Sequence, residues 1–324
     1  MPILSRRAFA LSGVAATMAL SSGRAVASAA SSPRGELAGQ SDLFVDLSTP
    51  MGNVEAYARI VGDTDPAATS YSWYAGRVSG QRPGEAARDL MRIIGMGTVR
   101  LLKRENGPGY MMLRKELGYF LDFETHEVID RWENPYSGET VTVDHIANPS
   151  INIELKPYRG DIGLYEEVDK ATSQPFLLNW TRVGDRVLTE NYADLWVRNP
   201  LDPEIWKRES SGLMIAISDS NSFNVSWADL QNPALTKVSS YGQWVHRRPW
   251  QPWMLMGQAE GAISYICATG SAASLYDLPE QIVTLARERH PDFLEAPTEM
   301  TKGESSLARY MRTRTPAPPR ERAE

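Results

Sequence analysis

Short β-type segments separated by turn-forming residues dominate the chain from residue 98 onward, and they constrain its fold more than any other feature. Asn106-Gly107-Pro108-Gly109 separates one pair of segments, and only Gly184-Asp185 separates another. This alternation is typical of antiparallel strands joined by hairpins. It predicts a mainly β protein, either an antiparallel barrel or a sandwich, with a few short helices. A closed barrel of about eight strands has room for one small ligand.

The spacing of apolar residues predicts individual elements. Helical spacing in residues 53–61 and 84–94 predicts a helix in each, with Gly95-Met96-Gly97 ending the second. A further helix is expected close to the C-terminus, ending near His290. We expect strands at residues 98–104, 110–122, 128–132, 140–147, 176–183, 187–197, 236–247 and 262–269.

The N-terminus carries a motif of two adjacent arginines. Arg6-Arg7 precedes an apolar run at residues 8–20, and Ala25-Val26-Ala27 follows. This pattern is typical of a twin-arginine signal peptide, here cleaved near Ala27 or Ala29. The apolar run is shorter than the roughly 20 residues that a membrane-spanning helix needs. We therefore expect recognition by the twin-arginine export machinery, a periplasmic location and no stable membrane insertion.

Composition divides the chain into four regions. Small polar residues follow the signal peptide, and the C-terminal end is rich in Ser, Arg and Pro with few apolar residues. Such compositions are typical of flexible segments. We expect a signal peptide at residues 1–27, a flexible leader at 28–45, a single β-rich domain at 46–298 and a disordered tail at 299–324.

The charge balance and the missing motifs exclude several classes of function. The chain has 34 Lys and Arg against 40 Asp and Glu, a net charge of −6, which argues against nucleic acid as a partner. Cys267 is the sole cysteine, so no disulfide forms within the chain. Neither a dinucleotide-binding nor a phosphate-binding glycine loop occurs, and we expect no cofactor. The four histidines lack the spacing of metal ligands, and we expect no metal.

His145 is the first candidate for chemistry. In the expected strand it shares a face with Val141, Val143 and Ala147, so its imidazole would point toward the core. A histidine in this position can act as a general acid or base. It can also be a core residue whose ring is hydrogen-bonded to the backbone. The sequence leaves both interpretations open.

Charged residues on two other predicted strands could assist. Glu190 shares a face with Tyr192 and Trp196, an arrangement that could hold a carboxyl in an apolar setting or form the solvated side of an outer strand. Asp130 could be a second proton-transfer group. Arg131 could bind a carboxylate or phenolate. The alternative for Asp130 and Arg131 is an ordinary surface ion pair.

An aromatic segment at residues 250–256 offers the densest recognition surface. Trp250, Trp253 and Met256 would favour an apolar or aromatic guest. Alternatively, these side chains fill the core. Trp244 and His246 share a strand face just before this segment and could line the mouth of a pocket, although His246 could also stack within an aromatic surface.

Three spaced motifs stand out: Trp132-x-Asn134-Pro135-x-Ser137-Gly138-Glu139, His145-x-x-Asn148 and Trp250-x-Pro252-Trp253-Met254-x-Met256-Gly257. Together they resemble the family catalogued as domain of unknown function 1838 (DUF1838), over about residues 46–297. The resemblance implies a lipocalin-like barrel, and it agrees with a twin-arginine leader. It also implies a pocket built from several of the matching residues, among them Trp132, Asn134, His145, Asn148, Trp250, Trp253 and Met256.

These features lead to one main functional hypothesis. The chain would be an exported enzyme that transforms a small hydrophobic or aromatic molecule by acid/base chemistry without a redox cofactor, as a lyase, isomerase or hydrolase. Its catalytic groups would be His145 as acid/base, Glu190 or Asp130 as second proton-transfer group, and Arg131 or Asn148 as the stabiliser of negative charge. Trp250, Trp253 and Met256 would hold the apolar body.

Two other classes of function remain open. A periplasmic binding or carrier protein for the same kind of ligand would need the aromatic pocket but no titrating group. A structural or interaction protein would be favoured if the segment at residues 250–256 were wholly packed, with no cavity beside it.

Overall fold

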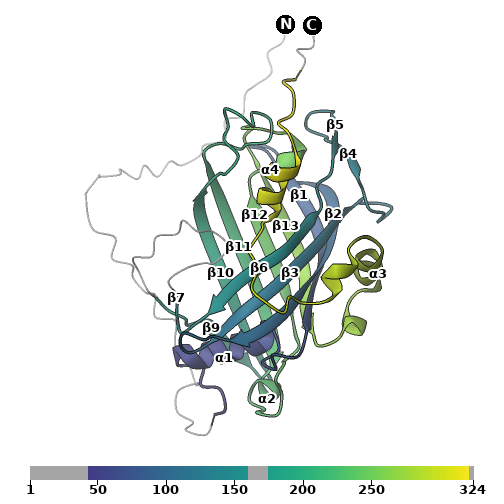
Figure 1. Cartoon of the computed structure of the whole chain (residues 1–324). Coiled ribbons are helices and arrows are strands. Elements are labelled where there is room, and N and C mark those ends of the chain that lie inside the picture. The colour runs from purple at the N-terminus through teal and green to yellow at the C-terminus, as the bar shows by residue number, and fades with distance from the viewer. Residues whose placement is uncertain (1–42, 160–173, 321–324) are drawn as a thin grey trace, which may run out of the picture. The chain divides into compact units, whose positions relative to one another are not determined.

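The computed structural model describes residues 43–159 and 174–320 (Figure 1). In this part of the chain, nine antiparallel strands form one sheet, which curls into a half-barrel. The prediction of a mainly β, antiparallel fold with a few short helices is confirmed. The predicted signal peptide and most of the predicted leader lie outside the described residues.

The elements have the following bounds. The main sheet contains β1 Ser70–Gln81, β2 Arg88–Lys103, β3 Tyr110–Leu121, β6 Ile146–Leu155, β9 Asn179–Val183, β10 Arg186–Arg198, β11 Met214–Ser226, β12 Ser240–Arg248 and β13 Ala262–Ala272. Two small sheets pair β4 Arg131–Glu133 with β5 Thr140–Thr142, and β7 Tyr158–Arg159 with β8 Gln174–Pro175. The α-helices are α1 Pro50–Val61, α2 Trp227–Leu230, α3 Glu280–Arg289 and α4 Ser306–Thr313. No helix among the described residues is long and apolar enough to cross a membrane.

Most strands lie beside their neighbours in sequence, and the order across the sheet is β6-β3-β2-β1-β13-β12-β11-β10-β9. The predicted hairpin between β9 and β10 is confirmed, because Val183 pairs with Arg186 across Gly184 and Asp185. Gly184 has a φ of 63°, the conformation that a two-residue hairpin turn with glycine in first place requires.

The concave face of the sheet holds α1, the helix predicted at residues 53–61. Val54 of α1 packs with Leu101 of β2, and Ile60 of the same helix packs with Val187 of β10. Because β2 and β10 are well separated in the strand order, one helix can contact both strands only if it lies on the concave side of the curved sheet. The side chains of α1 thus bury the concave face at one end of the half-barrel.

The convex face is covered in part by α3. Ile282 and Ala286 of this helix are buried against Ile94 and Leu117, which alternate away from the concave face. This amphipathic helix close to the C-terminus is the one that the sequence predicts.

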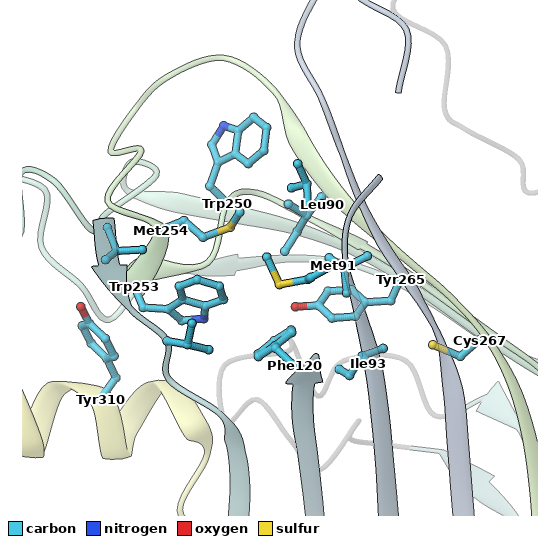
Figure 2. Packing of buried hydrophobic residues seen from close by; sticks show 14 of the residues in the cluster. Leu90, Met91, Ile93, Phe120, Trp250, Trp253, Met254, Tyr265, Cys267 and Tyr310 are labelled. Carbon is cyan, nitrogen blue, oxygen red and sulfur yellow. The ribbon is translucent and has the colours of Figure 1, made fainter. Parts of the chain in front are cut away.

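The end of the concave face opposite α1 is filled by large apolar side chains (Figure 2). We call this group the end cluster; it includes Met91, Ile93, Phe120, Trp250, Trp253, Met254, Tyr265 and Tyr310. Its members come from β2, β3 and β13, from the segment after β12, and from α4. Side chains of the β4–β5 hairpin, such as Trp132 and Val141, pack against the same cluster.

The helix predicted at residues 84–94 is wrong, because residues from Arg88 onward form β2. Met91 and Ile93 are buried in the end cluster, whereas Ile94 is buried on the convex face beneath α3. A strand covered on both faces has an almost continuous apolar run, and this run imitates helical spacing. Gly95-Met96-Gly97 consequently lies in the middle of a strand and ends no helix.

The prediction of a disordered tail from residue 299 is wrong for the region of α4. Tyr310 is buried beside Trp206, with 5.9 Å between the ring centroids, and Arg309 donates a hydrogen bond to the Ala147 carbonyl. A few well-placed contacts order this segment despite its polar composition. The predicted leader also ends too late, because Val45 is buried in the core.

Tyr74 lies flat across the concave face. Its hydroxyl donates to the Leu117 carbonyl at 3.1 Å, so the side chain of a β1 residue reaches β3 across β2. A Cβ at Gly95 would lie 2.1 Å from Cζ of Tyr74, and one at Gly118 would lie 2.3 Å from its hydroxyl. The two glycines therefore make room for the ring.

Gly95→Ala tests this close approach. The added methyl group must displace the Tyr74 ring, so we expect a loss of about 1–3 kcal/mol in the free energy of unfolding, measured by urea denaturation. Gly303→Ala is the matched control, because its Cβ would come no closer than 3.6 Å to the Ser150 carbonyl oxygen, and it should lose no stability. Equal stability of the two variants would contradict the packing described for Tyr74.

Candidate functional site

Polar side chains form a belt across the middle of the concave face, between α1 and the end cluster. Along β3, Met112 packs near α1 and Phe120 lies in the end cluster, and Arg114 and Glu116 lie between them. The same level of β12 carries Trp244 and His246. We call this group the concave belt; it consists of Arg114, Glu116, Asn148, Asp219, Trp244 and His246, with Tyr74 beneath it.

The register of the sheet places these residues on one face. Asp219 of β11 lies opposite His246 of β12, which lies opposite Tyr265 of β13. Directly paired residues of antiparallel strands share a face, and Tyr265 belongs to the end cluster on the concave side. Water reaches this level of the face, because the side chains of Asp219 and His246 are 35% and 15% exposed.

Asp219 holds two side chains of β12. Its Oδ1 accepts a hydrogen bond from Nε1 of Trp244 at 2.6 Å and lies 3.3 Å from Nδ1 of His246. The hydrogen bond from Trp244 fixes the carboxylate, which in turn orients the imidazole. Among the described residues, Nε2 of His246 has no hydrogen-bond partner. This histidine has one nitrogen on a carboxylate and the other open, the arrangement that general acid/base catalysis uses.

Aromatic rings support this pair. The ring of Trp244 lies 4.9 Å from that of Tyr74 and 5.5 Å from that of Tyr265. Burial raises the pKa of Tyr74 well above its ordinary value and that of Tyr265 to about 12, so both hydroxyls stay neutral at physiological pH. The belt therefore combines an uncharged aromatic surface with one acid/base pair.

The other side of the belt is a network around Glu116. Asn148 donates from Nδ2 to Glu116 at 2.9 Å, and its Oδ1 accepts from the hydroxyl of Ser306 in α4 at 2.7 Å. A guanidinium nitrogen of Arg114 lies 3.5 Å from the same carboxylate. Asn148, predicted as a stabiliser of negative charge, thus already uses its amide donor to bind Glu116.

His145 lies outside the concave belt, between β5 and β6. Its Nδ1 accepts the Phe120 backbone N–H at 3.2 Å, and its Nε2 donates to Asp130 at 3.2 Å. Arg289 of α3 donates to the same carboxylate at 3.0 Å. Because both ring nitrogens are engaged, His145 links β3 to the residue before β4 and has no nitrogen left to meet a substrate.

The pKa of His145 is lowered by burial, which outweighs the opposing effect of Asp130. The pKa of Asp130 is itself lowered, chiefly by its hydrogen bond from Arg289. His145 is therefore a neutral imidazole that donates a hydrogen bond to the Asp130 carboxylate.

The aromatic segment at residues 250–256 is part of the packed core. Trp250 and Trp253 are 3% and 4% exposed, and both lie among the large apolar side chains of the end cluster (Figure 2). The ring of Phe120 lies 5.3 Å from that of Trp253 and 6.1 Å from that of His145. This burial favours the interpretation that the segment fills the end of the half-barrel. Trp253 also meets the ring of Trp132 edge-on at 5.8 Å.

Asn134 fastens this segment to the β4–β5 hairpin. Its amide donates to the Met254 carbonyl at 2.8 Å and lies 3.2 Å from the sulfur of Met256. Two of the three motifs that resemble DUF1838 come together, since Trp132 packs in the same cluster as the 250–256 segment and Asn134 is hydrogen-bonded to Met254. They meet as a packed end of the half-barrel.

Glu190 and Arg131 are not brought to the belt. Glu190 faces away from the concave side, is exposed, and accepts a hydrogen bond from the Ser220 hydroxyl. Arg131 is exposed on β4, next to Asp130 in sequence. Among the described residues, no three His, Cys, Asp or Glu side chains gather closely enough to hold a metal ion.

Sequence reasoning missed Tyr74, Arg114, Glu116 and Asp219. None of them belongs to a spaced motif, and their proximity depends on how distant strands pair. Gly95-Met96-Gly97 was the usable signal, because glycine at alternate positions of a strand often marks a close approach by another group. This signal can be recognised only if residues 95–97 are first assigned to a strand, whereas the apolar spacing of residues 84–94 placed them at the end of a helix.

Comparison with known proteins gave one result. Residues 67–314 match the family described as "Protein of unknown function (DUF1838)". No curated protein matched the chain. The matched span runs from just before β1 to the residue after α4, so it includes the whole main sheet, the concave belt and the end cluster.

His145→Asn tests the structural role of this histidine. Asparagine keeps an acceptor for the Phe120 N–H but cannot titrate. Because the folded-state pKa of His145 is lowered, the unfolded chain takes up its proton first, and this contribution to stability is lost as pH falls through about 6.5. The loss of unfolding free energy between pH 7 and pH 5 should therefore be smaller in the variant. The control is His126→Asn, which replaces an exposed histidine. If the wild type, His145→Asn and His126→Asn all lost stability equally between pH 7 and pH 5, the structural role assigned to His145 would be contradicted.

Proposed function

This chain belongs to the DUF1838 family, and we propose that it is an enzyme that transforms a small hydrophobic or aromatic molecule in the concave belt by acid/base chemistry. One observation carries the proposal. His246 is oriented by Asp219 through one ring nitrogen and leaves the other open on a face that water reaches. The reaction needs no redox cofactor, and lyase, isomerase or hydrolase chemistry would fit.

In this mechanism His246 moves the proton. Its Nε2 takes a proton from the substrate or from a water molecule, and the positive charge that develops on the ring is stabilised by Asp219. Trp244 keeps the carboxylate in place through its 2.6 Å hydrogen bond. The same imidazolium then returns the proton to the product. A positioned acid/base group of this kind typically accelerates a reaction about 10²–10⁴-fold.

The rings of Tyr74 and Trp244 would hold the apolar body of the substrate. Tyr74 is largely buried, whereas Trp244 is only partly buried and can contribute its ring to a ligand. Flat aromatic surfaces give large contact area with little loss of side-chain entropy. We prefer His246 to His145 as the acid/base, because the 3.2 Å contacts of His145 occupy both of its nitrogens.

His246→Asn is the sharpest test of the mechanism. Asparagine can keep a polar contact with Asp219 at the position of Nδ1 but removes Nε2. The purified full chain would be screened with aryl esters, aryl epoxides and β-hydroxy aryl ketones, which report hydrolase and lyase chemistry. For any accepted substrate, kcat/KM should fall about 10²–10⁴-fold in His246→Asn.

His145→Asn and His126→Asn are the matched controls and should retain turnover. Undiminished turnover by His246→Asn would refute the assigned base. Binding of aromatic compounds without turnover of any substrate would favour the alternative of a carrier protein.

We also propose that the chain is exported through the twin-arginine pathway to the periplasm. Arg6-Arg7 and the following apolar run support this proposal. Replacing both arginines by lysine should trap the protein in the cytoplasm, measured by immunoblotting of cell fractions. Replacement of Arg24 and Arg34 by lysine is the matched control and should leave export unchanged. Normal export of the Arg6→Lys, Arg7→Lys double variant would refute the route.

A further inference from the structure

Arg248 occupies the concave face beside His246. The two residues are two positions apart on β12, so their side chains point to the same side of the sheet. Arg248 lies opposite Ile263 of β13, which is fully buried in the end cluster, and His246 lies opposite Tyr265. The guanidinium therefore extends from the border between the end cluster and the concave belt.

Arg248 has no polar partner among the described residues. It makes no hydrogen bond or ion pair there, and its Nε is buried without an acceptor. An unpaired buried donor on a charged group is costly, so native structures normally satisfy it. The structure thus places a guanidinium without a protein partner on the same strand face as the proposed acid/base.

Other arginines of the core show how such groups are usually satisfied. The buried guanidinium of Arg59 donates to four backbone carbonyls, those of Asp229, Leu230, Asn232 and Leu235. Arg114, the other arginine of the concave face with a buried unpaired Nε, has the carboxylate of Glu116 at 3.5 Å. Arg248 differs from both, because neither a carbonyl nor a carboxylate of the described chain meets it.

We propose that Arg248 binds a carboxylate of the ligand, and that the concave belt is therefore specific for aromatic or hydrophobic carboxylic acids. This inference rests on the proposed function, because it takes the belt as the ligand site. The carboxylate would accept hydrogen bonds from the guanidinium, and the apolar body would lie on Trp244 and Tyr74. His246 would then face the part of the molecule next to the carboxylate.

The charge of the surroundings favours a carboxylate over a phosphate. One guanidinium balances one negative charge, and Asp219 lies on the neighbouring strand, opposite His246. A phosphate dianion would leave a second charge uncompensated close to this carboxylate. The planar guanidinium also matches the planar carboxylate in geometry.

The test compares two probes of nearly the same shape, 2-naphthoate and the neutral 2-naphthylmethanol, by isothermal titration calorimetry with the full chain. The wild-type protein should bind naphthoate roughly tenfold to a hundredfold more tightly than the alcohol, the range for hydrogen bonds to a charged group. Arg248→Gln should lose this difference and keep its affinity for the alcohol. Arg248→Lys should show an intermediate affinity, because it keeps the charge and loses the paired donors.

Arg247→Gln is the matched control. Arg247 is the exposed neighbour on the opposite side of β12, so the variant has the same change in net charge and should bind both probes as the wild type does. Circular dichroism would verify that each variant is folded. A 2-naphthyl phosphate that binds more tightly than naphthoate would overturn the preference for a carboxylate.

The outcomes separate the two proposals. Equal affinity of wild type and Arg248→Gln for naphthoate, or no binding of either probe, overturns the carboxylate site. If His246→Asn retains turnover while Arg248→Gln loses its preference for naphthoate, the acid/base role fails and the carboxylate site stands. If turnover depends on His246 but the affinity for naphthoate is the same with and without Arg248, the proposed function stands and the carboxylate site fails.

Discussion

The position of Tyr74 on the sheet depends on two glycines, which have no side chains to block its ring. Because residues 95 and 118 are glycines, the ring of Tyr74 lies flat over β2 and its hydroxyl reaches the Leu117 carbonyl. Trp244 then packs at 4.9 Å from that ring, and its indole N–H fixes Asp219. The orientation of His246 by Asp219 is the last step of this chain of contacts. A side chain at either glycine would have to move Tyr74 and, through it, the residues of the proposed site.

The concave belt exists because the two ends of the concave face are filled. At one end α1 packs against strands from both sides of the curl, and at the other the end cluster brings together β2, β3, β13 and α4. Ionisable groups are expensive to bury in such packed regions. The ionisable groups of the belt lie between the two packed ends, at a level where Asp219 and His246 are partly exposed. The same arrangement explains why the aromatic segment at residues 250–256 closes an end of the half-barrel.

Much of the fold could be predicted from the sequence, but the site could not. The β9–β10 hairpin and α1 follow from local patterns, a two-residue glycine turn and an amphipathic spacing. The same reasoning failed at residues 84–94, where burial on both faces of β2 imitates a helix. His145 is only partly exposed, but it lies in no strand, and Val143 and Ala147, expected on one face with it, belong to two different clusters. Hydrogen bonds to Phe120 and Asp130 engage both nitrogens of its ring. His246 gave no stronger signal than His145, because its partner Asp219 comes from another strand.

The sequence by itself determined the fold class, the family and most of the strands, because turn residues and alternation act over a few neighbouring positions. Only the tertiary structure decided which polar residues meet. The pairing of β11 with β12 brings Asp219 to His246, and the curl of the sheet allows one helix to contact both β2 and β10. Such contacts join residues far apart in sequence, and they depend on register, where a shift of one residue would turn every side chain of a strand to the other face.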